Sequence, residues 1–257
     1  MKYHLHEIAG YIQSIYLVEQ QGVFFLLDGC SRPDVEVVKH YLEQVLGKSI
    51  YDLKLVIATH AHPDHFGGVS FFKNLYDIPV AGPAQVNSWY AGSFGFFTYC
   101  TDILLTYLVA VNKKKPIRNI LFPRSVNLDY ILRDQDVVPG FESWQVLVCP
   151  GHTDMDLSLY HSGDNLAYIA DNLVGKKNKV FRPYPLIRPD LYRETLTRYI
   201  NLGIENFLIA HYGKVRVTKQ QLESLIRSIP NEPRRHLTTL PRILLKLLKA
   251  FFRKKSQ

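Results

Sequence analysis

One short segment constrains this chain more than any other: His60, Ala61, His62, Pro63, Asp64 and His65. It follows an apolar run, Leu53–Thr59, that is typical of a buried strand. Residues two apart on an extended chain point to the same side, so His60 and His62 face one way before Pro63 turns the chain. This spacing arises by chance on the order of once in a thousand. Without a cation the cluster would leave buried polar groups unpaired, which favours a metal site over a surface histidine patch.

Three more side chains of the metal-binding type follow predicted strands in the second half of the chain. They are His152 in Pro150-Gly151-His152-Thr153, Asp171 after the 166–170 run, and His211 after the 206–210 run. Strand ends that meet at one rim are where an α/β body builds its site. We therefore expect these side chains to join the first cluster.

The order of these motifs resembles that of the metallo-β-lactamase superfamily of metal-dependent hydrolases, in particular its glyoxalase II-like and lactonase-like members. The matching residues are H-x-H-x-D-H at 60–65, P-G-H-T at 150–153, Ala-Asp at 170–171, His211, and the early Leu27-Asp28-Gly29, over roughly residues 8–215. The resemblance implies an α/β fold, the αββα sandwich, with metals at one edge between two sheets. Alanine stands at 170 and 210, before the Asp and the last His, where the family commonly has glycine.

The resemblance also assigns roles to individual residues. It implies that one metal ion is bound by His60, His62 and His152, and a second by Asp64, His65 and His211, with Asp171 bridging the two and Asp28 behind the ligands. Five imidazoles and two carboxylates suit zinc, and the same donors also admit iron, manganese or cobalt. The lack of cysteine ligands argues against a closed structural zinc site.

Two divalent cations a few ångströms apart share a water and lower its pKa towards roughly 7. Asp64 is then a candidate acceptor for the proton of the attacking water, and Asp28 is a candidate to orient an imidazole through its outer N–H. Tyr212, beside His211, and Tyr184 are candidate donors to an oxyanion.

The rest of the pattern predicts strands and helices in both halves. Strands are expected at 11–19, 23–28, 53–59, 78–82, 128–132, 144–149, 157–161, 166–170 and 206–210, and helices at 33–46, 69–76, 189–202 and 218–228. We expect a layered α/β body rather than βαβ winding. The three cysteines are expected to be small buried hydrophobes, and His40, His161 and His236 to lie at the surface.

Two segments lie outside the ligand-bearing pattern. Residues 88–119 are aromatic and apolar, which predicts an inserted helix or pair of helices that forms a lid or pocket wall, extends the core, or makes a dimer contact. Residues 234–257 hold eight basic residues and no acid, whereas residues 1–233 hold 23 of each. On a helix, Arg242, Lys246, Lys249 and Arg253 form a narrow basic stripe. This tail is expected either to bind an anionic membrane surface or to dock on the domain or a second subunit.

The chain contains no sequence run that predicts a clean membrane span. The charge-free stretch Ile78–Thr101 is broken by prolines and glycines, and Ile103–Val111 is far shorter than the roughly 20 residues required. The N-terminal residues have no apolar signal core. The expected location is therefore the cytoplasm, with peripheral attachment at the inner membrane face through the tail.

These features predict a metallo-hydrolase with a single catalytic domain at 1–233. Its expected reaction is cleavage of an ester-like acyl bond, a thioester or lactone, in a partly apolar small molecule. A phosphodiesterase or RNA-processing nuclease of the same superfamily is the alternative, and the neutral body disfavours nucleic acid as a partner. A mononuclear iron persulfide dioxygenase is a third possibility, and a non-catalytic membrane-binding module is a fourth.

Overall fold

The part of the chain that the structure describes forms two six-stranded sheets and one separate hairpin. The first sheet has, in spatial order, β1 (His4–Ala9), β2 (Ser14–Gln20), β3 (Val23–Leu26), β4 (Leu53–Ile57), β5 (Val80–Gly82) and β6 (Tyr130–Ile131). The second has β14 (Gly213–Arg216), β13 (Asn206–Ile209), β10 (Leu166–Tyr168), β9 (Leu157–His161), β8 (Phe141–Val148) and β7 (Val137–Val138). The hairpin pairs β11 (Val174–Lys176) with β12 (Lys179–Phe181). The structure is a computed structural model that describes residues 2–176 and 179–234.

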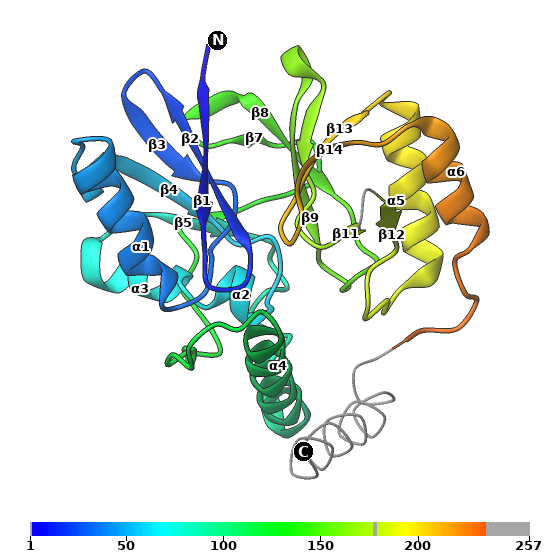
Figure 1. The fold of residues 1–257 in the computed structure, drawn as a ribbon, viewed down its shortest axis with the longest axis horizontal. Coiled ribbons are helices and arrows are strands. Elements are labelled where there is room, and N and C mark those ends of the chain that lie inside the picture. Colours follow the sequence, from blue (N-terminus) through cyan, green and yellow to red (C-terminus); the bar gives the residue numbers. More distant parts are fainter. Residues whose placement is uncertain (1, 177–178, 235–257) are drawn as a thin grey trace, which may run out of the picture.

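Helices cover the outer faces of the two sheets (Figure 1). The first sheet is covered by α1 (Asp34–His40), which a π-helical turn continues over Tyr41–Val45, and by α3 (Val69–Tyr76). The second is covered by α5 (Pro189–Asn201) and α6 (Lys219–Arg227). The short α2 (Pro63–Phe66) and the long α4 (Gly92–Asn112) lie at the lower edge of the sandwich in Figure 1. The expected αββα sandwich is thus confirmed.

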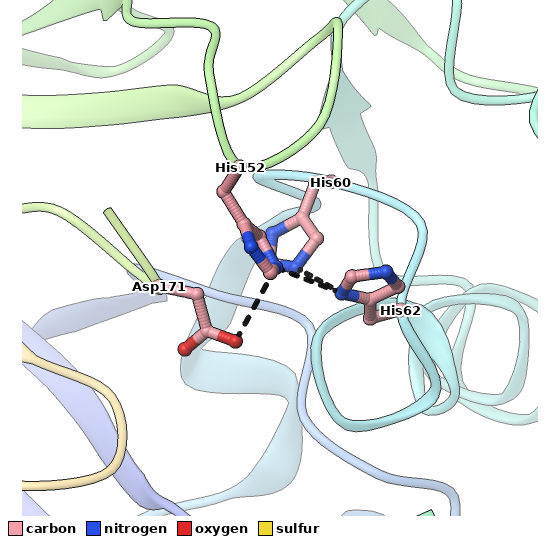
Figure 2. A group of neighbouring side chains, drawn as sticks. All are labelled: His60, His62, His152 and Asp171. Atoms are coloured by element: carbon pink, nitrogen blue, oxygen red, sulfur yellow. Dashed lines mark hydrogen bonds and ion pairs between the residues drawn. The ribbon is translucent and has the colours of Figure 1, made fainter. Parts of the chain in front are cut away.

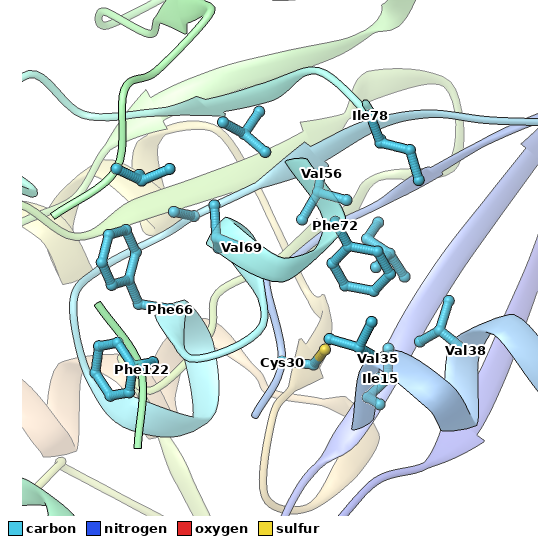
Figure 3. Close-up of a cluster of buried hydrophobic side chains, with 14 of the residues drawn as sticks. Ile15, Cys30, Val35, Val38, Val56, Phe66, Val69, Phe72, Ile78 and Phe122 are labelled. Atoms are coloured by element: carbon cyan, nitrogen blue, oxygen red, sulfur yellow. The ribbon is translucent and has the colours of Figure 1, made fainter. Parts of the chain in front are cut away.

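Each interface between layers contains its own apolar core, because the inner strands are buried on both faces. In β3, Phe24 points beneath α1 and α3, whereas Phe25 points between the sheets. In β13, Phe207 points beneath α5 and α6, whereas Leu208 points between the sheets. Figure 3 shows the core beneath α1 and α3. The alternation explains why these strands read as continuous apolar runs in the sequence.

Most predicted elements are present, but the strand connections differ from expectation. Strands β3, β4, β5 and β6 run parallel. Helix α1 lies between β3 and β4 along the chain, and α3 lies between β4 and β5. The first half is therefore built from βαβ units, and the expectation of no βαβ winding is wrong, because apolar periodicity does not report strand direction. Strands β1, β7, β11, β12 and β14 are absent from the predicted set, and apart from the six-residue β1 none of them is longer than four residues.

Two burial expectations are also wrong. His161 is buried, because its ring packs against Tyr3 and Trp144 with centroid distances of 4.6 and 5.3 Å. Cys100 is exposed, because it lies on the solvent-facing side of α4, whereas Cys30 and Cys149 are buried as expected.

The inserted segment forms the single helix α4, which is 21 residues long. By length and composition alone, α4 is able to cross a membrane, and no other helix of the described residues passes that test. The apolar runs of the sequence did not indicate this, because Asp102 divides them while the helix continues through it. The predicted amphipathic tail lies outside the described residues.

The loop after β3 and the turn between α2 and α3 approach so closely that only glycine fits. A Cβ at Gly29 would lie 2.5 Å from the carbonyl oxygen of His65, and a Cβ at Gly68 would lie 2.6 Å from the carbonyl oxygen of Gly29. The Gly68 N–H also donates to the Cys30 carbonyl at 2.9 Å. This contact brings the Asp28 loop against the helix that carries His65.

Candidate metal centre

The histidine-rich segment begins where β4 ends, at the edge between the two sheets. His62 has an extended backbone and stands at the N-cap of α2, and Pro63 occupies the first position of that helix. Proline suits this position because the missing N–H has no partner in the first helical turn. The change from strand to helix lets one short segment direct side chains at the site from two directions.

Three imidazoles and one carboxylate converge in the first group, drawn in Figure 2. The Nδ1 atom of His62 lies 3.1 Å from Nε2 of His60 and 3.0 Å from Nε2 of His152. The Nε2 atom of His152 lies 3.6 Å from Oδ2 of Asp171. Zinc–nitrogen bonds of about 2.0–2.1 Å separate tetrahedral donors by roughly 3.3 Å, which is close to this spacing.

The second group consists of Asp64, His65 and His211. Oδ2 of Asp64 lies 3.0 Å from Nε2 of His211 and 3.5 Å from Nε2 of His65. Asp171 lies between the groups, because its Oδ2 is also 3.5 Å from Nε2 of His65 and its Oδ1 is 3.4 Å from Nε2 of His211. The structure thus brings together all seven predicted ligands, in the two sets that the sequence resemblance implies.

The outer nitrogen of four of these imidazoles is held by a partner outside the site. His152 Nδ1 lies 3.0 Å from the Pro185 carbonyl oxygen, and His211 Nδ1 lies 3.1 Å from the Ile12 carbonyl oxygen. His60 Nδ1 lies 3.1 Å from Oγ1 of Thr59. Such partners fix the ring orientation and leave the other nitrogen for a metal.

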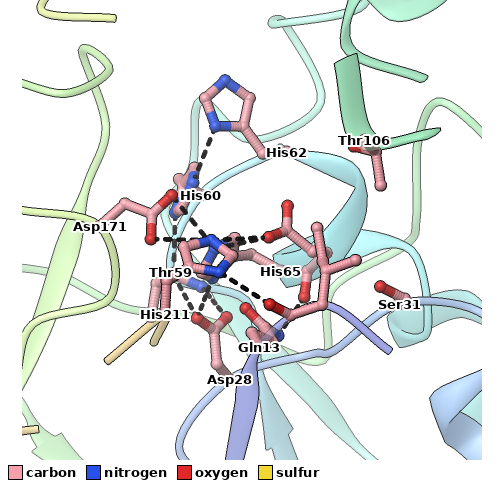
Figure 4. A network of polar contacts seen from close by, with 12 residues as sticks. Gln13, Asp28, Ser31, Thr59, His60, His62, His65, Thr106, Asp171 and His211 are labelled. Atoms are coloured by element: carbon pink, nitrogen blue, oxygen red, sulfur yellow. Dashed lines mark hydrogen bonds and ion pairs between the residues drawn. The ribbon is translucent and has the colours of Figure 1, made fainter. Parts of the chain in front are cut away.

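The fourth outer partner is Asp28, at the centre of the network in Figure 4. Its carboxylate lies 2.5 Å from His65 Nδ1 and accepts hydrogen bonds from Thr59 Oγ1 at 2.9 Å and from the Tyr168 hydroxyl at 2.7 Å. The backbone N–H groups of Gly29 and Thr59 donate to its other oxygen at 2.9 and 3.2 Å. Asp28 therefore contacts His65 on the side away from the second group, as expected from the sequence.

In the absence of a metal, the protonation of the imidazoles differs between the two groups. Burial, and then repulsion from the neighbouring imidazoles, lowers the pKa of His60 well below its ordinary value, so this ring is neutral, as metal binding requires. Burial alone would also lower the pKa of His211, but Asp171 and Asp64 raise it to about 10. Burial opposes ionisation of Asp64 too, yet His65 and His211 lower the pKa of that carboxyl to about 2. The second group is thus a charged cluster when it carries protons in place of a metal.

Two buried atoms support the fit of a metal to these residues. Nε2 of His65 and Oδ1 of Asp171 are buried, and neither has a hydrogen-bond partner among the described residues. Buried polar atoms are normally satisfied, so such atoms need an explanation. Both belong to the groups described above, and a cation shared with their neighbours would satisfy them.

Asp102, on α4, is a buried carboxylate near the site that sequence reasoning missed. Its Oδ2 lies 3.9 Å from the outer nitrogen of His62, and it accepts hydrogen bonds from the Tyr90 hydroxyl at 3.0 Å and from Trp89 Nε1 at 3.4 Å. Spacing along the sequence gave no sign of this contact, because it depends on the angle at which α4 meets α2.

Asp156 is a second buried carboxylate that sequence reasoning missed. Its carboxylate accepts hydrogen bonds from the Thr153 N–H and hydroxyl, both at 2.7 Å, and so braces the loop that carries His152.

A cavity of about 800 Å³ opens onto both groups. Its floor contains His62, Asp64, His152, Asp171 and His211, and one wall is α4, through Asp102, Leu105, Thr106, Leu108, Val109 and Asn112. The expected pocket wall is therefore present.

Of the two candidate oxyanion donors, Tyr184 lines the cavity. The ring of Tyr212 packs on the backbone of Gly175 instead: a Cβ added at Gly175 would lie 1.9 Å from Cγ of Tyr212.

The backbone before Asp171 has a conformation that usually requires glycine. Ala170 has a φ of 46°, in the left-handed region. An alanine held there is strained, and the surrounding structure keeps it in place, since the Ala170 carbonyl accepts from the Ala210 N–H at 3.2 Å. Alanine at positions 170 and 210 thus leaves the turn intact.

Comparison with known proteins identifies the class. The family model described as the metallo-beta-lactamase superfamily matches residues 8–211, so the chain belongs to that superfamily. A curated relative, "Probable metallo-hydrolase YflN" of Bacillus subtilis (strain 168), is 25% identical over 177 residues, which cover 66% of this chain and 64% of that protein. The match thus spans less than two thirds of the relative.

Solved structures show the same fold. The metallo-beta-lactamase family protein TTHA1429 of Thermus thermophilus has a TM-score of 0.64 at 20% identity, over 88% of this chain and 78% of that one. The archaeal superfamily protein ST1585 of Sulfolobus tokodaii has a TM-score of 0.62 at 16% identity, over 90% and 88%. TTHA1623, solved in a di-iron-bound form, has a TM-score of 0.55 at 22% identity, over 81% and 92%.

Metal loading should release protons. In the metal-free protein His211 has a pKa of about 10, and Asp28, Asp64 and Asp171 overcome the opposing effect of burial to raise the pKa of His65 well above its ordinary value. Both rings are therefore protonated at pH 7 and must lose a proton to bind a metal, so loading should release about two protons and weaken as the pH falls. Calorimetric titration with Zn²⁺ in two buffers of different ionisation enthalpy measures this release. Identical enthalpies in both buffers would contradict it.

The Asp28 network should contribute to metal retention. Tyr168→Phe removes one donor from the Asp28 carboxylate and should lower metal affinity about tenfold, at the low end of the effects seen for such partners. Tyr16→Phe is the matched control, because its ring packs on Tyr168 at 5.6 Å between centroids while its hydroxyl lies by Glu7. Competition with a chromogenic chelator gives both affinities. Equal affinities for the two variants would show that the hydrogen bond from Tyr168 to Asp28 does not contribute to metal retention.

Proposed function

We propose that this protein is a metal-dependent hydrolase that cleaves an ester-like acyl bond, a thioester or lactone, in a substrate with an apolar arm. The proposed centre is dinuclear, with zinc as the favoured metal. Metal ions held by the two ligand groups would provide hydroxide at neutral pH and would polarise the carbonyl of the substrate. Family membership and the two ligand groups support the hydrolase; the ester-like substrate and the number of metals are our inference.

The cavity is the observation that carries the substrate class. Its floor is polar and is built from the two ligand groups, whereas Leu105, Leu108 and Val109 of α4, with Ile12 and Val174 opposite, give it apolar sides. A substrate that fits has a polar reacting group joined to an apolar arm. Among the described residues the lining includes no serine or cysteine, so the proposed nucleophile is water.

The chain's own residues have separate tasks in this proposal. Asp64 accepts the proton of the attacking water, and its contact with His211, at 3.0 Å between Oδ2 and Nε2, positions the carboxylate. Asp28 positions His65, and Asp102 positions His62. We assign the oxyanion donor to Tyr184, which lines the cavity, in place of Tyr212.

Ligand substitutions test the hydrolase. Asp171→Asn and His62→Ala should each lower kcat/KM by more than the roughly 10–100-fold that loss of an outer partner costs, with a matching loss of bound metal. His40→Ala is the control, because His40 is exposed on α1. Elemental analysis and a panel of thioesters, lactones, phosphodiesters, persulfides and β-lactams provide the measurements. Activity on phosphodiesters or persulfides alone would refute the acyl-bond assignment, as would full metal content with no acyl hydrolysis.

Acyl chain length tests the apolar arm. Each methylene that leaves water contributes about 0.8 kcal/mol, so kcat/KM should rise up to about fourfold per methylene until the cavity is filled. Leu108→Ala should flatten this dependence, whereas Leu75→Ala, a change at an exposed leucine of α3, should leave it unchanged. A wild-type profile that does not vary with chain length would contradict the proposed contact with α4.

A further inference from the structure

Helix α4 exposes apolar side chains along one stripe. Phe97, Cys100, Leu104 and Val111 recur at the three- and four-residue spacing of one helix face, and all are exposed. Phe97 is 64% and Val111 54% exposed, and Phe94, at the start of the helix, is 65% exposed. Contiguous exposed apolar surface of this kind is typical of an interaction site.

The other faces of α4 are already in use. One packs on the domain through residues such as Tyr99, Ile103 and Ala110, which belong to the core beneath α1 and α3. A second lines the cavity with Leu105, Leu108 and Val109. The exposed stripe is a third face and serves neither purpose. Its members from Phe97 to Val111 are apolar, although a solvent-facing helix side normally carries polar residues.

The segment after the stripe is strongly basic. Between Gly92 and Ser125 the acidic residues are limited to Asp102, which is buried, while five basic residues are present: Lys113, Lys114, Lys115, Arg118 and Arg124. The same segment exposes Ile117, at 77%, and Leu121. The guanidinium of Arg124 stands 5.5 Å from the ring centroid of Phe96. Apolar and cationic groups therefore share one surface, here called the α4 surface, which comprises the stripe, the exposed phenylalanines and residues 113–124.

We propose that the α4 surface seats the protein on an anionic lipid bilayer, with α4 lying in the headgroup region rather than crossing it. Apolar side chains beside lysine and arginine are the composition that binds such an interface. If α4 crossed the bilayer, it would have to leave the domain. The face of α4 that packs in the core, and the buried Asp102, would then lose their contacts. This inference does not depend on the proposed hydrolysis.

Charge favours a bilayer over a second protein copy. A copy docked through the same surface would bring five more cations and no exposed acid, because Asp102 is buried, so the two surfaces would not be complementary in charge. The chain's own tail, residues 234–257, adds eight basic residues and no acid. Anionic headgroups complement all of these charges.

The position of residue 234 is consistent with this orientation. Arg234 and Leu186 exchange backbone hydrogen bonds of 2.9 and 2.8 Å, and the adjacent residues Tyr184 and Pro185 line the cavity. The basic tail therefore starts beside the cavity, and α4 forms another wall of that cavity. The basic segment after α4 and the basic tail therefore both begin near the cavity.

Vesicle sedimentation of the full chain tests the proposal. Wild type should bind phosphatidylcholine vesicles that contain about 30% phosphatidylglycerol, enough for an anionic surface, much more tightly than pure phosphatidylcholine. The double variant Phe97→Ser/Leu104→Ser should reduce the partition coefficient at least tenfold, and so should Lys114→Glu/Arg118→Glu. These residues contribute neither to the candidate metal groups nor to the cavity lining.

Matched variants elsewhere on the surface are the controls. Leu75→Ser, at an exposed leucine of α3, and Lys219→Glu/Arg227→Glu on α6 should bind like wild type. Circular dichroism and metal content establish that each variant is folded, and the charge-reversal pair keeps the test valid if the apolar pair misfolds. Wild-type binding by both α4 variants would overturn the proposal, because the tail alone would then account for it. So would an absence of vesicle binding by wild type, and a dimer that Phe97→Ser/Leu104→Ser dissociates would then assign the α4 surface to a second copy of the chain.

Discussion

The buried carboxylate of Asp28 is the interaction on which the arrangement of the site depends. It follows β3 of the first sheet, yet one of its donors, Tyr168, belongs to β10 of the second. Burying a carboxylate is costly unless it is fully hydrogen-bonded, and here two backbone N–H groups, two hydroxyls and one imidazole surround it. The same contacts therefore hold the edges of the two sheets together and fix the ring of His65. Glycine at 29 and 68 is what allows the loop to approach this closely.

The imidazoles of His152 and His211 are likewise held by buried partners on their outer nitrogens. Backbone carbonyls of Pro185 and Ile12, from segments distant in sequence, hold His152 and His211, so the inner nitrogens converge without depending on flexible side chains. Several rings within about 3 Å of one another repel when protonated, and burial makes that repulsion stronger. This is why the pKa of His60 is lowered while the pKa of His211, beside two carboxylates, is raised. One group is thus ready to bind a cation, whereas the other exchanges protons for it.

The candidate ligands were predictable from sequence because each follows an apolar strand closely, either in the loop after the strand or, for Asp64 and His65, in the short helix α2 that comes next. The ends of such strands meet at one edge of the sheets. His211 and His152 illustrate this. Asp102 was not predictable, because a helix inserted between the two halves brings it to His62 and nothing in its local pattern marks the contact. Strand direction was not predictable either, since a strand buried on both faces, such as β3, has the same pattern in parallel and antiparallel sheets. The burial of His161 was misjudged because it depends on packing against Trp144, a tertiary contact.

Helix α4 explains how one insertion can combine several tasks. Its side chains divide among three faces: one packs in the core beneath α1 and α3, one lines the cavity, and one exposes apolar residues. Its single acid, Asp102, is buried beside His62, where Tyr90 and Trp89 satisfy it. A shift of the helix would therefore alter the cavity wall and the surroundings of His62 together. In this superfamily member, the element that we propose selects the substrate is thus mechanically joined to the candidate metal centre, and it is the same element whose outer face we propose contacts the membrane.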